Sequence, residues 1–113
     1  MGKISYYKDK NKKKKNRTEY VFLKFEYHNG NELICRILEK YFNMKSEILV
    51  DEVTGIWFSV VRVYDELDDY EVVWDEDMGN LIYSTDQSEE INVRLEERVK
   101  FVAEKLNEIM QEE

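Results

Sequence analysis

The chain has 113 residues, enough for one domain with one hydrophobic core. Because 42% of the residues are hydrophobic, the composition excludes a largely disordered chain. The single cysteine excludes an internal disulfide bond, and the lack of an apolar stretch of about 18 residues excludes a membrane-spanning helix. The net charge of −8 is divided unevenly: residues 1–17 hold eight basic residues and one acid, a local charge of +7, whereas the other 96 residues hold nine basic and 24 acidic residues, a charge of −15.

The basic N-terminal segment, residues 1–17, has two interpretations. Its lysine run cannot bury hydrophobic surface, so we expect a flexible arm or, if residues 4–7 pair with the next strand, the loop of a hairpin. Residues 18–113 then form a single acidic domain. The N-terminus lacks the apolar core of a signal peptide, which together with the single cysteine predicts a cytoplasmic location.

The domain is predicted to begin with a strand and a helix. Apolar side chains alternate through residues 18–27, which indicates a strand, and the sequence HNG at 28–30 is typical of a turn. Asn31 can then cap a helix that ends near residue 43, in which apolar residues recur at helical spacing.

Four more strands and a long helix are predicted after it. The strands lie at 48–53, 56–64, 70–74 and 81–83, with a turn at 51–55. Trp57 and its neighbours make the second of these apolar on both faces, which is typical of a central strand. Asp86 and Glu89 fit a capping box at the start of a helix that runs from residue 87 to the C-terminus.

This order, β-α-β-β-β-β-α, predicts the α+β class. The economical packing is a two-layer sandwich, with an antiparallel sheet of four or five strands and both helices on one face. The C-terminal helix is expected to be the longer of the two.

An acidic cluster is the main candidate for a binding surface. Eight carboxylates lie within 13 residues, namely Asp65, Glu66, Asp68, Asp69, Glu71, Asp75, Glu76 and Asp77. The cluster is either a solvated rim or a recognition surface for a basic protein, with the rings of Tyr70 and Trp74 as apolar anchors. A calcium site is a third interpretation, but the loop pattern fails at Gly79, Asn80 and Asp86, so we expect no metal and no cofactor.

The lysine run is a candidate phosphate-binding site. Lys12, Lys13, Lys14, Lys15 and Arg17 could bind nucleic acid by releasing its counterions. The run could equally be a solubilising tail, or could fold over the acidic cluster and screen it. The charge of −15 on the remaining chain opposes nucleic-acid binding, because the same duplex that attracts the run repels the domain.

His28 and Cys35 are the remaining pair with catalytic chemistry. A nucleophilic cysteine needs a base within hydrogen-bond reach and a group that orients that base, and no Asn or Asp is clearly placed to orient His28. A lone cysteine on a helix is more often a small buried hydrophobic residue. We therefore expect no enzyme and no catalytic residue.

The chain carries no motif of a recognised family. As a small acidic α+β protein it is similar, in general character and not in specific residues, to bacterial immunity proteins and to phage-encoded inhibitors that imitate DNA, including anti-restriction and anti-CRISPR proteins. The leading hypothesis is an inhibitor that occupies a basic site on a nuclease or another nucleic-acid enzyme. A nucleic-acid-associated protein and a self-associating module, such as a homodimer, are the alternatives, and no membrane partner is expected.

Overall fold

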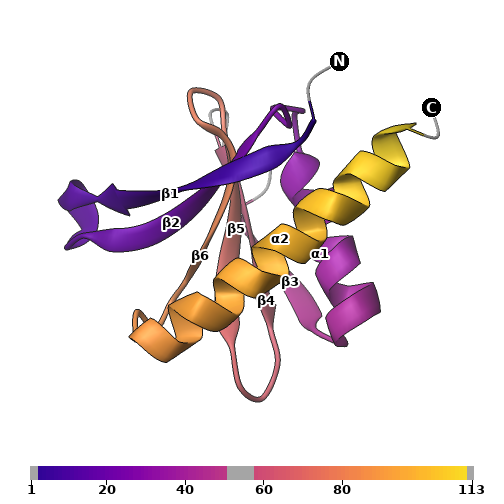
Figure 1. The fold of residues 1–113 in the computed structure, drawn as a ribbon. Helices are drawn as coiled ribbons and strands as arrows, with labels where there is room; N and C mark the ends of the chain where they lie inside the picture. The colour runs from indigo at the N-terminus through magenta and orange to yellow at the C-terminus, as the bar shows by residue number, and fades with distance from the viewer. Residues whose placement is uncertain (1–2, 51–57, 112–113) are drawn as a thin grey trace.

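One antiparallel sheet of six strands and two helices make up the fold in the computed structural model, which describes residues 3–50 and 58–111 (Figure 1). Across the sheet the strands lie in the order β1-β2-β6-β5-β4-β3. The elements are β1 Ser5–Asn11, β2 Arg17–Leu23, α1 Gly30–Phe42, β3 Lys45–Val50, β4 Phe58–Tyr64, β5 Asp69–Asp75, β6 Gly79–Ser84 and α2 Glu89–Gln111.

The predicted class is confirmed, with two helices on one face and the C-terminal helix the longer, but the sheet has six strands instead of four or five. The additional strand is β1, which pairs with β2 in continuous antiparallel register from Ser5 opposite Leu23 to Asn11 opposite Arg17. Lysines suit this position because β1 is an edge strand, where charged side chains reach water. The lysine run therefore forms the loop of a hairpin.

The core lies between the sheet and the helices. Tyr70 and Val72 of β5 and Leu95 and Leu106 of α2 are fully buried, and α1 adds Leu38. Each buried leucine side chain contributes about 2 kcal/mol of hydrophobic stabilisation. α1 contacts β3, β4, β5 and β6, whereas α2 contacts β1, β2 and β6, so each helix covers a different part of the same face.

Both helices begin at residues other than those predicted. The N-cap of α1 is Asn29, in a left-handed conformation, and Asn31 instead points into the core, where its amide donates hydrogen bonds to the Ser59 and Val72 carbonyl oxygens at 3.3 and 3.2 Å. At α2 the Ser88 hydroxyl accepts from the backbone N–H of Ile91 at 3.3 Å. Ser88 is thus the capping residue, and the Asp86 carboxylate accepts from the Ser88 N–H just before the helix.

Strand boundaries also differ from the prediction. β2 ends at Leu23 because Lys24 has a positive φ of 64°, which turns the chain so that Phe25 enters the core. β3 begins earlier than expected, at Lys45, and its side chains are mostly exposed, so hydrophobic alternation could not reveal its start. The predicted turn at 51–55, the neighbouring strand ends at 51–53 and 56–57, and Trp57 lie outside the described residues. No helix in the described part of the chain is both long and apolar enough to cross a membrane.

Gly30, the first residue of α1, packs against two side chains. An added Cβ would lie 2.6 Å from Asn80 Nδ2 and 2.8 Å from Phe25 Cε2. Neither atom can move easily, because Asn80 Nδ2 donates to the carbonyl oxygens of Phe25 and Tyr27, both at 3.0 Å, and the Phe25 ring is in the core.

We expect Gly30→Ala to lower the free energy of unfolding by about 2 kcal/mol, although alanine favours helix formation by about 1 kcal/mol over glycine. Urea denaturation of both proteins measures the difference. Glu32→Ala, at an exposed position in the same helical turn, is the control and should change stability by less than about 0.5 kcal/mol. A Gly30→Ala protein as stable as the wild type would contradict the packing at α1.

Candidate functional site

The eight carboxylates between residues 65 and 77 do not form one continuous surface. The strand β5 separates the β4–β5 loop, which holds Asp65, Glu66 and Asp68, from the β5–β6 turn, which holds Glu76 and Asp77. Seven residues of strand place the two ends about 20 Å apart. Most carboxylates in the cluster are also engaged in contacts within the protein.

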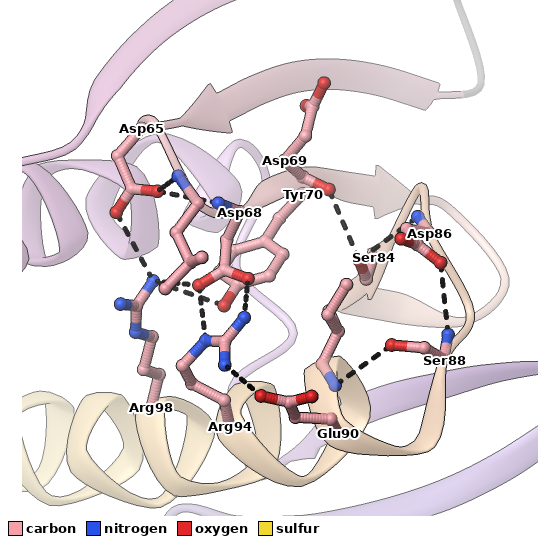
Figure 2. A network of polar contacts seen from close by, with 12 residues as sticks. Asp65, Asp68, Asp69, Tyr70, Ser84, Asp86, Ser88, Glu90, Arg94 and Arg98 are labelled. Carbon is pink, nitrogen blue, oxygen red and sulfur yellow. Dashed lines mark hydrogen bonds and ion pairs between the residues drawn. The ribbon is translucent and has the colours of Figure 1, made fainter.

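Asp68 is the most strongly engaged of them. Its side chain is fully buried and lies between two arginines of α2 (Figure 2). Arg94 Nε and Nη2 donate to the two carboxylate oxygens at 2.7 and 2.6 Å, and Arg98 Nη1 lies 3.2 Å from Asp68 Oδ2. Burial alone would raise the pKa of Asp68, but the hydrogen bonds and charge of Arg94, together with the charge of Arg98, outweigh it and lower that pKa.

Tyr70 lies beside this ion pair in the core. Its hydroxyl accepts a hydrogen bond from Arg98 Nη1 at 3.2 Å, and its ring has no exposed surface. Burial raises the pKa of Tyr70, and the Asp68 carboxylate raises it further against the opposing charge of Arg98. A ring in this position cannot contact a partner, which corrects the expectation of an exposed anchor at Tyr70.

Trp74 is also withdrawn from the surface. It is 9% exposed and stacks on the His28 ring, with centroids 4.3 Å apart. Both aromatic residues are inward because side chains alternate along β5, so that Tyr70, Val72 and Trp74 all face the helices.

Four further carboxylates have local structural roles. Asp65 accepts from the backbone N–H groups of Leu67 and Asp68, and Asp75 accepts from those of Asp77 and Met78, so each closes a turn. Asp69 accepts two hydrogen bonds from Arg62 Nε and Nη2, both at 3.0 Å, and Glu71 accepts from the Tyr83 hydroxyl at 2.5 Å. Of the predicted acidic residues, Glu66, Glu76 and Asp77 remain exposed.

A different acidic surface lies on the outside of α2. Five exposed glutamates, Glu89, Glu90, Glu97, Glu104 and Glu108, fall within an arc of about 100° when successive residues are rotated by 100°. We call them the acidic helix face. Glu90 lies 3.9 Å from Arg94, Glu108 lies 3.0 Å from Lys105, and Lys100 is an exposed base on the same arc.

This face is not conspicuous in the sequence because its residues are spread over 20 positions. The available signal was the spacing of seven between Glu90, Glu97 and Glu104, which places side chains on one side of a helix. The dense run at 65–77 was more conspicuous, but neighbouring positions in a strand and its loops point in different directions.

The lysine run caps the β1–β2 hairpin. Lys12–Lys14 form a 3₁₀ turn, and Lys15 and Asn16 come next with positive φ values of 56° and 59°. Lys12–Lys15, named here the lysine loop, are all exposed. Arg17 is not available with them, because its guanidinium donates to the buried Glu19 carboxylate and stacks 3.5 Å from the centroid of the Tyr83 ring.

The chemistry of Cys35 is set by its burial. The thiol lies in the hydrophobic core on α1, and burial, followed by the nearby Glu39 and Glu32 charges, raises its pKa to about 12. It is therefore protonated at neutral pH and is a poor nucleophile. His28 lies outside α1, stacked on Trp74.

Comparison with known proteins finds no matching family, no matching curated protein and no matching solved structure. Within the described residues, no group of three or more His, Cys, Asp or Glu side chains is arranged to hold a metal ion.

Asp68→Asn should lower the free energy of unfolding by about 3 kcal/mol, because it leaves two arginines without their buried counter-charge. Urea denaturation at neutral pH measures the loss. Glu66→Gln, an exposed change in the same loop, is the matched control and should cost less than about 0.5 kcal/mol. Equal stabilities of the two variants would show that the ion pair adds nothing.

The same pair predicts a pH dependence. Since the folded-state pKa of Asp68 is lowered, its stabilisation is complete above the unfolded-state pKa of about 3.9 and is lost as the pH falls through the folded value. The stability difference between wild type and Asp68→Asn should therefore be constant from about pH 5 to 7 and shrink below about pH 4. A difference that grows on acidification would contradict this ionisation.

Proposed function

We propose that this protein is a non-catalytic binding module whose acidic helix face occupies a basic site on a partner protein. The observation that carries the proposal is the row of five exposed glutamates along one side of α2. The interval from Glu90 to Glu108 spans about 27 Å at 1.5 Å per residue. A negative row of this length suits the extended basic groove of a nuclease or another nucleic-acid enzyme.

The side of α2 that lies opposite this face is packed in the core. The opposite side of α2 carries Leu95, Val99, Val102 and Leu106, all buried at 1% exposure or less. The Asp68 pair adds a polar attachment near the N-terminal half of the helix. A helix that is already formed loses little backbone entropy on binding, which confines the entropic cost to the glutamate side chains, and a field of one sign raises the association rate with a basic partner.

This proposal keeps the acidic inhibitor class expected from the sequence and moves its surface from residues 65–77 to α2. Asp68 and Tyr70 are removed from the interface by burial, and Trp74 contributes little exposed area. Val93, which is 57% exposed on the same arc, offers an apolar contact within the acidic helix face.

The test compares two double charge reversals with the same change in net charge. Glu97→Lys with Glu104→Lys alters the acidic helix face, and Glu66→Lys with Glu76→Lys alters the acids that remain exposed at the two ends of β5. Each protein is immobilised and used to capture proteins from a lysate of the native host, with quantitative mass spectrometry at low and high salt. We expect wild type and the β5-end variant to retain one basic protein at low salt, and the α2 variant to lose it by at least about tenfold.

The captured protein is then purified, its affinity for the wild type and both variants is measured, and inhibition of its activity is tested. Loss of capture in the β5-end variant alone would place the interface at the β4–β5 loop and the β5–β6 turn. Capture that is unaffected by either variant, or by salt, would reject an acidic interface altogether.

Self-association is the second candidate function, because β3 is an edge strand with exposed apolar side chains. Ile48 and Leu49 are 60% and 46% exposed, and the outer side of the strand can pair with a second copy. On this hypothesis sedimentation equilibrium should detect a concentration-dependent dimer that Ile48→Lys weakens. A wild-type protein that stays monomeric at high concentration would exclude it.

A further inference from the structure

We propose that the β1–β2 hairpin is a second binding site, which takes the phosphate backbone of a nucleic acid. This site does not require the partner protein proposed for the acidic helix face, although Glu89 of that face also lines the cavity beside the hairpin. It consists of the lysine loop, Lys12–Lys15, together with Lys8 and Lys10 of β1.

The hairpin carries six lysines, four in the loop at its far end and two in β1, where Asp9 stands between them. Strands β1 and β2 extend away from the rest of the sheet, and the lysine loop forms their far end (Figure 1). Lys8 pairs with Glu96 at 3.4 Å and Lys10 donates to the Thr18 hydroxyl at 2.7 Å. Among the residues that the structure describes, no carboxylate lies within ion-pair distance of the lysine loop.

The lysine loop has a defined shape. The Asn11 side chain accepts from the backbone N–H of Lys13 at 3.1 Å and donates to Glu19 at 3.0 Å, and Arg17 donates to the same Glu19 oxygen at 2.6 Å. Glu19 is 1% exposed, so the base of the loop is fixed from inside the sheet. The fold therefore holds four like charges together in water, an arrangement that an anion stabilises.

A cavity of about 490 Å³ adjoins the lysines, between the hairpin and the N-terminal half of α2. Its lining includes Lys8, Lys10 and Lys15 and the neutral polar side chains of Thr18, Gln87 and Asn92. Glu89 and Glu96 line the side formed by α2, where Lys8 partly neutralises Glu96. Phosphates would lie along the lysines, and Asn92 could contact the sugar or base edges of the same strand, whereas Thr18 and Gln87 already form hydrogen bonds within the protein.

The composition of the site favours nucleic acid over a lipid surface. The lysine loop and Asn16 contain no apolar side chain that could enter a bilayer, whereas membrane-binding segments combine basic residues with aromatic or aliphatic ones. Lysine acts as a point charge without the bidentate geometry of arginine, so binding should depend on salt and little on sequence.

The projection of the hairpin reduces the repulsion that the acidic domain is expected to exert on a nucleic acid. A strand that contacts the lysine loop and the adjoining cavity meets α2 only along its N-terminal half and need not follow the rest of the helix, because the loop is at the far end of the hairpin from the sheet. The Lys8–Glu96 pair marks the boundary between the basic and acidic surfaces.

Fluorescence anisotropy with labelled oligonucleotides of about 12 nucleotides, single-stranded DNA, single-stranded RNA and duplex DNA, tests the proposal between about 50 and 200 mM salt. The full chain is compared with the loop variant K12A/K13A/K14A. The matched control K40A/K45A/K100A removes three exposed lysines elsewhere and has the same net charge. The variant K12R/K13R/K14R keeps the charge of the loop.

We expect the wild type to bind at least one of the oligonucleotides, and the comparison among them identifies the preferred form. The loop variant should lose at least about tenfold in affinity at low salt, and the slope of log K against log salt should fall by about two to three units. The control should change affinity by less than about threefold, and the arginine variant should bind like the wild type.

The proposal is overturned if the wild type binds no oligonucleotide at about 50 mM salt. It is also overturned if the loop and control variants lose affinity equally, because net charge and not the hairpin would then be responsible. Binding only to anionic phospholipid vesicles would replace nucleic acid with a membrane surface. Thermal unfolding of all variants verifies that the exposed substitutions leave the fold intact.

Discussion

The position of α2 depends on one buried carboxylate. Asp68 has no exposed side-chain surface, yet it stays ionised because Arg94 and Arg98 surround it. Hydrophobic contacts alone would tolerate small rotations or shifts of a helix on a sheet, whereas a buried charge must meet its partners or remain unpaired. Asp68 lies in the β4–β5 loop, so the pair also fixes that loop against the helix.

Fixing the rotation of α2 determines which charges reach the surface. With Leu95, Leu106 and the two arginines directed at the sheet and its loops, the glutamates at 90, 97 and 104 must point to solvent. The internal ion pairs and the acidic helix face are therefore two consequences of one orientation. Asp68 neutralises much of the charge of Arg94 and Arg98. These arginines therefore offset the negative field outside only in part, through the approach of Arg94 to Glu90.

Periodicity in the sequence predicted the architecture, whereas contacts between residues distant in the chain were missed. Alternation along β5 and the apolar stripe of α2 sufficed for the two-layer α+β fold. Strand β1 could not be predicted with certainty, because its lysines are expected to be solvent-exposed whether or not its backbone pairs with β2. Asn31 is a residue type that often caps helices, but its actual hydrogen-bond partners are Ser59 and Val72, which are distant in sequence. The density of acids at 65–77 likewise could not reveal that Arg62 and Arg94 engage two of them.

The pairing of β1 with β2 has an electrostatic consequence. A flexible tail of charge +7 would collapse onto a domain of charge −15 and lose its own charge while cancelling about half of the domain's. Antiparallel pairing prevents this, and the bonds from Ile4 to Asn107, at 2.8 and 2.9 Å, and from Tyr6 to Glu96, at 2.9 Å, attach the inner end of β1 to α2. The lysine loop is thereby kept away from most of the acidic helix face. Two surfaces of opposite sign persist in one small protein because backbone hydrogen bonds oppose their attraction.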